Sequence, residues 1–410
     1  MSPIEVTTEA EDRYHRLRLI PWWDQEVLRN ARVLVVGAGA LGNEILKNLG
    51  LLGVGWIAVV DLDRVETSNL SRSVLFRHGD EGRQKALVTA ERLMDLNPDV
   101  HCLGMVADIT TDIGLGVFRA MDVVIAGLDN REARLAINQA CWRVNRPWID
   151  GAIEVLMGVA RVFVPPGGPC YECTMSELDF QLVAERKSCA LLKRTDVGKI
   201  PTTPTTASVI AGVEVQEAVK ILHGRETAAN LRGKGFFFEG ETHESFKVIY
   251  QARPGCLAHY TYPEVREIGR GVAQVTLAEL LAMARVDLGS GATLEFEREI
   301  VTEFVCPQCA RSQAVFRPLG ALTSADAQCP DCGTIRVPQS THRVAGEERY
   351  LDLTLAGFGL PPADIVTGQA GDNAVHYELH ADLELVLPGW PARDTGGGIA
   401  SARQDRAARG

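Results

Sequence analysis

The stretch RVLVVGAGALGNEILKNLGLLGV, residues 32–54, decides the fold of this chain. Residues 33–36 form an unbroken apolar run, which is typical of a strand covered on both faces of a parallel sheet. Gly37, Gly39 and Gly42 follow directly as a GxGxxG turn that opens a helix. Glycines at these places let the backbone turn tightly and approach phosphate groups at the helix N-terminus. The stretch therefore predicts a nucleotide-binding strand, turn and helix.

Strands and helices alternate on both sides of this stretch. Residues 1–30 are expected to be helical, and helices are also predicted at 82–98 and 131–145. Apolar runs predict further strands at residues 56–63, 99–108, 122–130 and 146–153. This alternation predicts the α/β class, with a doubly wound, Rossmann-like and mostly parallel sheet.

The pattern changes at Met157, where residues 157–166 alternate as an antiparallel strand does. We therefore expect an antiparallel continuation of the sheet, closed by a hairpin within residues 235–252. Residues 199–206, KIPTTPTT, are expected to be extended because the residue before a proline disfavours helix. Residues 207–224 predict an apolar helix that ends at Gly224.

Three parts are expected along the chain. Residues 1–265 form the first domain, with a polar segment at about residues 174–206. Residues 266–390 form a small C-terminal α+β domain around two CxxC pairs, and residues 391–410 are a Gly/Ala/Arg-rich tail that we expect to be disordered.

Composition excludes several classes of function. The formal net charge of −11 disfavours nucleic acid as a partner, since phosphate binding needs a basic surface. The polar N-terminus predicts no signal peptide, and the lack of any apolar run of 18 residues predicts no membrane span. We therefore expect a cytoplasmic protein, in which ten cysteines indicate metal sites or a reactive thiol rather than disulfides.

Charged and amide side chains after the second strand indicate which nucleotide binds. Asp61 ends that strand, where an acid binds ribose hydroxyls. Asn69 and Arg72 follow, and Lys85 opens the next predicted helix. A dehydrogenase has no use for this set, whereas a triphosphate under attack needs cations against its developing charge. Salt-bridged surface charges are the simpler alternative for each residue taken singly.

Asp129 ends another predicted strand, in the sequence Ala126-Gly-Leu-Asp129-Asn130. Ligands of doubly wound sheets bind at this edge, and a carboxylate there can hold Mg²⁺ between phosphates. Helix capping by Asp129 or Asn130 is an alternative that does not exclude the metal.

Two CxxC pairs, Cys306/Cys309 and Cys329/Cys332, lie close together in the C-terminal domain. This spacing predicts a zinc ribbon, a structural site in which four thiolates leave no open coordination position. A pairing of Cys306/Cys309 with a third CxxC pair, Cys170/Cys173, is the alternative, but it would leave Cys329/Cys332 without partners.

The residues quoted so far, together with EGRQKA at 81–86 and IPTTPTTASVIAGVEVQEAVKIL at 200–222, resemble the activating-enzyme superfamily. This superfamily contains the ubiquitin-activating enzymes and the ThiF–MoeB–HesA adenylyltransferases of molybdopterin and thiamine biosynthesis. Several motifs occur in order over residues 10–260. The resemblance implies a bacterial-type member that carries a zinc-ribbon extension, with residues 1–265 as its ATP-binding adenylation domain.

The resemblance also implies roles for individual residues. Asp61 corresponds to the ribose ligand and Asp129 to the magnesium-binding aspartate. Arg16 resembles an arginine that reaches the ATP of the partner subunit, which implies a homodimer. The glycine turn and a phosphate-contacting set complete the site: Gly37, Gly39, Gly42, Asn69, Arg72 and Lys85. Ser73 departs from the family pattern, which usually has Gln after this arginine.

Two cysteine features gain meaning from the resemblance. Cys189 lies among Lys187, Lys193 and Arg194, which favour a thiolate, and it occupies the region where ubiquitin-type enzymes carry their catalytic cysteine. A buried structural cysteine is the alternative. In bacterial relatives a pair such as Cys170/Cys173 joins a second CxxC after the closing strand. Here Cys256 and His259 stand in that place, which implies a Cys₃His zinc site.

We therefore expect an activating enzyme that uses ATP, Mg²⁺ and Zn²⁺. It adenylates the C-terminal carboxylate of a ubiquitin-like protein, takes the acyl group as a thioester on Cys189 and passes it to a conjugating enzyme. The alternative is a sulfur-carrier protein adenylyltransferase without an obligatory thioester. A non-catalytic nucleotide-binding scaffold and an NAD-dependent oxidoreductase are further alternatives. The C-terminal domain has no catalytic set, so we expect it to recruit the carrier or the conjugating enzyme, or to stabilise the dimer.

Overall fold

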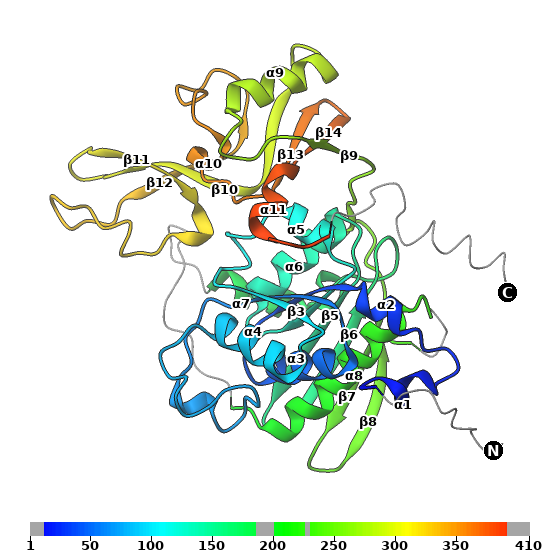
Figure 1. The fold of residues 1–410 in the computed structure, drawn as a ribbon. Helices are drawn as coiled ribbons and strands as arrows, with labels where there is room; N and C mark the ends of the chain where they lie inside the picture. Colours follow the sequence, from blue (N-terminus) through cyan, green and yellow to red (C-terminus); the bar gives the residue numbers. More distant parts are fainter. Residues whose placement is uncertain (1–11, 186–200, 226–229, 392–410) are drawn as a thin grey trace.

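The structure, a computed structural model, describes residues 12–185, 201–225 and 230–391. Its larger sheet has eight strands in the order β3-β2-β1-β4-β5-β6-β7-β8 (Figure 1). The first five in this order pair parallel and the last three continue antiparallel. This confirms the predicted fold class. The strands are β1 Arg32–Val36, β2 Trp56–Val60, β3 His101–Met105, β4 Val123–Gly127, β5 Trp148–Glu154, β6 Met157–Phe163, β7 Lys234–Glu239 and β8 Glu244–Ile249.

Helices cover both faces of the parallel part of this sheet. Alternate residues of its strands point to opposite faces, and apolar side chains on both faces need cover. Val33 and Val35 of β1 pack with α3 (Ala40–Leu52), α4 (Lys85–Leu96) and α8 (Pro204–Leu222). Leu34 and Val36 pack with α5 (Leu115–Ala120) and α6 (Arg131–Arg143) on the other face. All four β1 side chains are almost completely buried, as the continuous apolar run predicts.

Helix α8 begins earlier than predicted. Pro204, Thr205 and Thr206 are helical, so the expectation of an extended segment is wrong for these three residues. Thr203 is the N-cap and accepts a hydrogen bond from the amide of Thr206, while Pro204 occupies the first helical position. Proline is favoured there because its missing N–H would have no helical partner.

The N-terminal region is less helical than predicted. Within it the structure describes two short helices, α1 (His15–Arg18) and α2 (Gln25–Arg29). Tyr14, just before α1, is buried, and its hydroxyl accepts a hydrogen bond from Asn97 at 2.8 Å. The polar segment after β6 contains one further described helix, α7 (Glu177–Glu185).

The second sheet is antiparallel except for its edge strand β9. Its strand order is β11-β10-β13-β14-β9. The long strand β10 pairs with β13 and β11 along successive parts of one edge, and with β12 along the opposite edge. In Figure 1, β10, β11 and β12 extend as an arm away from the rest of this sheet. The elements are β9 Val265–Ile268, α9 Leu277–Leu288, β10 Thr293–Val305, β11 Ser312–Pro318, β12 Val337–Val344, α10 Leu355–Phe358, β13 Ile365–Ala370, β14 Asn373–Leu379 and α11 Leu383–Val386.

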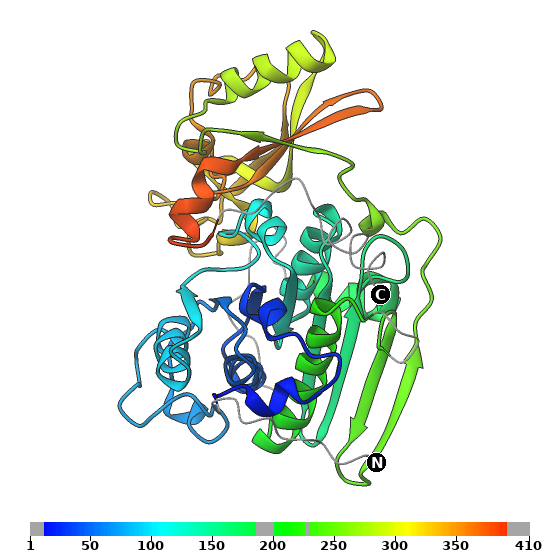
Figure 2. The same ribbon diagram turned by 45° about the vertical axis from the view of Figure 1, so that its right-hand side comes forward.

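The second sheet stands against α5 and α6 of the larger unit, as both ribbon views show (Figures 1 and 2). Asp364 accepts a hydrogen bond from the amide of Leu115, and the amide of Gly116 donates to the carbonyl of Ala363. Arg119 of α5 forms ion pairs with Glu267 of β9 and Glu378 of β14. Buried hydrogen bonds and ion pairs therefore hold this contact.

The domain boundaries at residues 265 and 390 stay predictions, and residues 392–410 of the expected tail lie outside the described residues. Within the described parts of the chain, no helix combines the length and apolarity that a membrane crossing requires.

Candidate functional site

The glycine turn lies between β1 and α3, as predicted. Gly37 has a φ of +94°, and a Cβ built there would lie 2.6 Å from the carbonyl oxygen of Gly127. A Cβ on Gly42 would lie 1.9 Å from the carbonyl oxygen of Gly37. Both positions therefore require glycine for the fold, because no side chain fits between these backbones.

Gly39 differs, because a Cβ there would meet nothing within 4 Å. Gly39 is the N-cap of α3 and has no side chain to cap the helix. No side chain caps the first amide groups of α3, which suits them to bind an anionic group. This glycine leaves room for a ligand rather than for the protein backbone.

Asp61 lies against the glycine turn. Its carboxylate accepts hydrogen bonds from the amides of Ala38, at 2.7 Å, and Asp63, at 2.8 Å. Burial raises the pKa of Asp61, while the nearby cation of Lys85 and the two amides oppose that rise. The carboxylate is thus held at the end of β2 beside the turn, as expected of a ribose ligand.

The segment with Asn69 and Arg72 also returns to the turn. Buried Asn43 of α3 donates to the carbonyls of Ala38 and Gly39 and accepts a hydrogen bond from the amide of Leu75 at 3.0 Å. The oxygen of Asn69 accepts from the amide of Glu66 at 2.9 Å, which closes a capping box. Asn43 therefore ties Leu75, at the end of this segment, to the glycine turn.

Arg72 and its neighbour Ser73 occupy this same segment. The Arg72 guanidinium donates to the carbonyl of Ser68 at 2.7 Å. Ser73 is buried, and its hydroxyl has no hydrogen-bond partner among the described residues. The side chain at position 73 is thus turned into the protein.

Lys85 is the first residue of α4, and its ammonium lies 2.9 Å from the carboxylate of Asp63. The Lys85 side chain is 11% exposed, whereas that of Asp63 is 60% exposed. The cation of Lys85 also opposes the rise in the pKa of Asp61, so Lys85 lies near the ribose-binding candidate.

Asp129 is exposed directly after β4, and Asn130 rather than Asp129 caps the next helix. The Asn130 side chain accepts a hydrogen bond from the amide of Ala133 at 2.8 Å. Asp129 therefore does not have the capping role that was weighed against Mg²⁺ binding. The neighbouring Gly127 contacts Gly37, so Asp129 lies at the same sheet edge as the glycine turn.

Sequence analysis missed a buried charge network below Asp129. Arg134 of α6 donates to Asp150 of β5 at 2.6 Å and to the carbonyl of Leu128 at 2.5 Å. Arg161 of β6 lies 2.6 Å from the other oxygen of Asp150. Burial and Asp150 raise the pKa of the fully buried Glu214 well above its ordinary value, while Arg134 opposes the rise.

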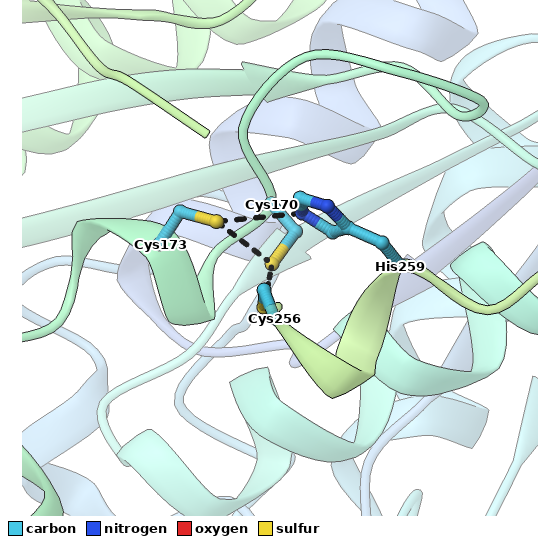
Figure 3. A group of neighbouring side chains, drawn as sticks. All are labelled: Cys170, Cys173, Cys256 and His259. Atoms are coloured by element: carbon cyan, nitrogen blue, oxygen red, sulfur yellow. Dashed lines mark hydrogen bonds between the residues drawn. The ribbon is translucent and has the colours of Figure 1, made fainter. Parts of the chain in front are cut away.

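Figure 3 shows the four predicted ligands of the first cysteine centre, brought together from segments far apart in the sequence. The Sγ of Cys170 lies 3.7 Å from that of Cys173 and 3.7 Å from that of Cys256, and Cys173 Sγ lies 3.4 Å from His259 Nε2. Tetrahedral Zn²⁺ with Zn–S bonds of about 2.3 Å places two sulfurs roughly 3.8 Å apart. The four residues thus fit a zinc ion.

The second cysteine centre joins the loops at the end of the β10–β12 arm. Cys306 and Cys332 have Sγ atoms 3.5 Å apart, and those of Cys309 and Cys329 are 3.7 Å apart. These four ligand atoms lie within 4.8 Å of one another, as do the four of the first centre. Two separate centres form, which excludes the alternative pairing of Cys170/Cys173 with Cys306/Cys309.

A third group, Glu267, Glu378 and His380, also has ligand atoms within 4.8 Å of one another. The guanidinium of Arg119 already forms ion pairs with both of its carboxylates. A cation of the protein thus occupies the place that a metal ion would take, and this group serves the contact between the two sheets.

Arg16 does not join the other candidate residues within the chain. It lies exposed on α1, next to Tyr14, whose ring packs against Gly53 at the C-terminal end of α3. The glycine turn lies at the opposite end of that helix, about 20 Å away for thirteen residues. Cys189 lies outside the described residues.

The sequence pattern of the ThiF family matches residues 12–258. The sulfur carrier protein adenylyltransferase of Thermus thermophilus is 34% identical over 270 residues, which cover 64% of this chain and 95% of that protein. The SAMP-activating enzyme E1 of Haloferax volcanii is 33% identical over 235 residues, 56% of this chain and 80% of that protein. The NEDD8-activating enzyme E1 catalytic subunit of Arabidopsis thaliana is 38% identical over 157 residues, and the match spans only 34% of its length.

Solved structures support the same fold. The crystal structure of E. coli MccB with ATP superposes with a TM-score of 0.51 at 22% identity, over 62% of this chain and 75% of that one. At this identity the likeness concerns the fold alone.

Proposed function

Because this chain belongs to the ThiF family, we propose that it adenylates the C-terminal carboxylate of a sulfur-carrier protein. It is an enzyme of the kind that its relatives' names describe, the adenylyltransferases and E1-type activating enzymes. The observation that carries the proposal is the gathering of Asp61, Lys85 and Asp129 around the glycine turn. The relative matched over almost its whole length is named for a sulfur carrier, which favours this substrate class.

In the proposed reaction an oxygen of the carrier carboxylate attacks the α-phosphorus of ATP. The bond between this phosphorus and the bridging oxygen to the β-phosphate breaks, so acyl-adenylate and pyrophosphate are the products. A carboxylate is a poor electrophile, and its mixed anhydride with AMP is the activated form.

The side chains then have distinct tasks. Asp61 accepts hydrogen bonds from the ribose hydroxyls, and the uncapped amide groups after Gly39 hold phosphate oxygens. Asn69, Arg72 and Lys85 contact the triphosphate, and the two cations stabilise charge that develops as pyrophosphate leaves. Lys85 exchanges its exposed partner Asp63 for phosphate when ATP binds. Asp129 would hold Mg²⁺, which neutralises charge on the phosphates when bound.

Both cysteine centres would hold structural Zn²⁺, since four protein ligands leave no open position for catalysis. The Cys₃His centre joins the segment after β6 to the segment after β8. The four-cysteine centre fixes the tip of the arm. We propose that this arm and its sheet recruit the carrier.

Intact-protein mass spectrometry tests the proposed reaction. Purified enzyme is mixed with Mg-ATP, inorganic pyrophosphatase and a panel of small β-grasp carriers that end in glycine. One carrier is expected to gain the mass of AMP less water, and the same carrier without its terminal glycine is expected to gain nothing. The proposal fails if no carrier in a panel of sulfur-carrier and ubiquitin-like types is adenylated.

The similarity to the SAMP-activating enzyme E1 of Haloferax volcanii, over 80% of its length, favours a second candidate. This candidate is activation of a ubiquitin-like protein with a thioester on Cys189. A conjugating enzyme would then receive the acyl group. This candidate predicts an adduct of enzyme and carrier that a thiol reductant cleaves and that Cys189→Ser abolishes. Adenylation without such an adduct leaves the sulfur-carrier function.

Arg16 is proposed to act across a homodimer, because within one chain it lies far from the glycine turn. A mixture of Arg16→Ala and Asp129→Ala subunits tests this. If Arg16 serves the partner, one site of each mixed dimer is complete and activity returns on mixing. If mixed dimers form and stay inactive, Arg16 does not act in this way.

A further inference from the structure

Helix α6 carries a buried stripe of three side chains, Arg134, Asn138 and Trp142, spaced four residues apart. Residues at this spacing lie along one side of a helix. Their exposed fractions are 6%, 0% and 1%, respectively. Two of the three are polar, and burial of polar groups is costly unless they are hydrogen-bonded. The partners of this stripe therefore show what it holds in place.

At the N-terminal end of the stripe, Arg134 holds the loop that contains Asp129. Its guanidinium donates to the carbonyls of Leu128, at 2.5 Å, and Gly151, at 3.1 Å, and to the carboxylate of Asp150. A hydrogen bond to the residue directly before Asp129 limits where the Asp129 carboxylate can lie. Asp150 in turn fixes the orientation of the guanidinium.

The other two residues of the stripe hold the Cys₃His centre. The Asn138 side chain accepts a hydrogen bond from the amide of Tyr171, the residue between Cys170 and Glu172, at 2.9 Å. The Trp142 ring stacks on the His259 imidazole, with ring centroids 4.3 Å apart and an interplanar angle of 16°. Trp142 and Cys170 also share one small buried cluster.

A second route joins the same two places through the sheet. The Arg161 guanidinium lies over the ring of Tyr171, 5.1 Å from its centroid, and pairs with Asp150 at 2.6 Å. Asp150 pairs with Arg134, which reaches Leu128. Direct contacts thus link the cysteine centre to the Asp129 loop, through Tyr171, Arg161, Asp150, Arg134 and Leu128.

We infer that Arg134 and Asn138 are positioning residues, through which the Cys₃His centre sets the place of Asp129 for Mg-ATP. This inference rests on the proposed function, since it assigns Mg-ATP to Asp129. Zn²⁺ held by Cys170, Cys173, Cys256 and His259 would order the segment of Tyr171 and the His259 ring. Asn138 and Trp142 of α6 contact these two residues, and Arg134 of the same helix holds the loop of Asp129. Replacing a residue that orients a metal ligand in this way typically lowers metal affinity by roughly 10- to 100-fold.

The affinity for ATP, measured with and without Mg²⁺, tests the inference. A misplaced Asp129 weakens binding only when Mg²⁺ is present, whereas general damage to the site weakens binding in both conditions. Dissociation constants of ATP are measured by calorimetry on the full chain, once with saturating Mg²⁺ and once with a magnesium-selective chelator. The wild type is expected to bind ATP more tightly with Mg²⁺. In Arg134→Lys and Asn138→Ala, the factor by which Mg²⁺ tightens ATP binding is expected to fall about 10-fold. The affinity for ATP without Mg²⁺ is expected to stay unchanged.

Arg336→Lys is the matched control. Arg336 is also a buried arginine that donates to backbone carbonyls, those of Asp326 and Ala327, but it lies in the arm near the four-cysteine centre. This variant is expected to keep the full effect of Mg²⁺. Zinc content, measured by elemental analysis, should stay unchanged in Arg134→Lys, and Cys256→Ser should lose both zinc and the effect of Mg²⁺.

The inference is overturned if Asn138→Ala and Arg134→Lys retain the wild-type effect of Mg²⁺. It is also overturned if they weaken ATP binding equally with and without Mg²⁺, since that result means damage to the whole site. Pyrophosphate release by the wild type with its carrier is measured in parallel. If the wild type releases pyrophosphate while the variants keep the effect of Mg²⁺, the positioning role alone fails.

Discussion

Gly37 lies directly against Gly127, so that a Cβ on Gly37 would stand 2.6 Å from the Gly127 carbonyl oxygen. The contact joins the turn after β1 to the last residue of β4, two residues before Asp129. Gly37→Ala should therefore lower the free energy of unfolding by about 2 kcal/mol or more, since its φ of +94° and the clash both oppose a side chain. Denaturant unfolding measures this.

Gly39→Ala is the matched comparison for Gly37→Ala. Because a Cβ at Gly39 meets nothing within 4 Å, this variant should fold normally and lose ATP affinity instead. Equal loss of stability in both variants would contradict the assignment of Gly39 to the ligand.

Lys85→Ala should slow pyrophosphate formation about 100-fold, the usual cost of removing a group that stabilises charge in the transition state. Stability should change little, because the partner of Lys85 is the exposed Asp63 and such pairs contribute about 1 kcal/mol or less. Steady-state pyrophosphate release and thermal unfolding measure the two effects. Lys220→Ala, which breaks a lysine ion pair on α8, is the control and should retain full activity.

Glu214→Gln should become more stable than the wild type as the pH rises. Burial raises the pKa of Glu214 well above its ordinary value, so the folded protein keeps a proton that the unfolded chain releases above about pH 4.3. The folded state therefore loses stability as the pH rises from the unfolded pKa toward the raised folded pKa. Glutamine is neutral throughout, so the melting temperatures of variant and wild type should diverge from pH 5 to pH 8.

Glu217→Gln, on the same helix, provides the contrast. Glu217 is buried but pairs with Lys220 and accepts a hydrogen bond from the amide of Leu231, so its replacement should destabilise the protein. Parallel melting curves for Glu214→Gln and wild type at all pH values would show that Glu214 is charged in the folded state.

Elemental analysis should find zinc in both cysteine centres. Cys256→Ser and Cys332→Ser should each remove the zinc of one centre, and each should lower the melting temperature because metal binding contributes to folding. Zinc that remains in the double variant, or an absence of zinc from the wild type, would contradict the assignment.

The sequence allowed prediction of the features that depend on local spacing. The GxGxxG turn, the position of Asp61 at the end of β2 and the four-cysteine centre follow from short motifs. The Cys₃His centre was expected only from the family resemblance, and the structure brings the four ligands of each centre together as expected. The start of α8 was misplaced because Pro204 is compatible with the first turn of a helix.

The network of Arg134, Asp150, Arg161 and Glu214 could not be predicted. Its members come from α6, β5, β6 and α8, and no fixed spacing links them. A charged residue in an amphipathic helix such as α6 also resembles a solvent-exposed one until the packing is known. The one available signal was Asp150 within the otherwise apolar run of residues 148–153, since a buried carboxylate needs a partner.

Exchange of labelled pyrophosphate into ATP, with the carrier protein present, tests the central claim most directly. The account predicts exchange that requires the carrier and its intact C-terminus, and that Arg72→Ala, Lys85→Ala and Asp129→Ala each reduce strongly. Exchange that proceeds without a carrier, or that persists undiminished in all three variants, would contradict it.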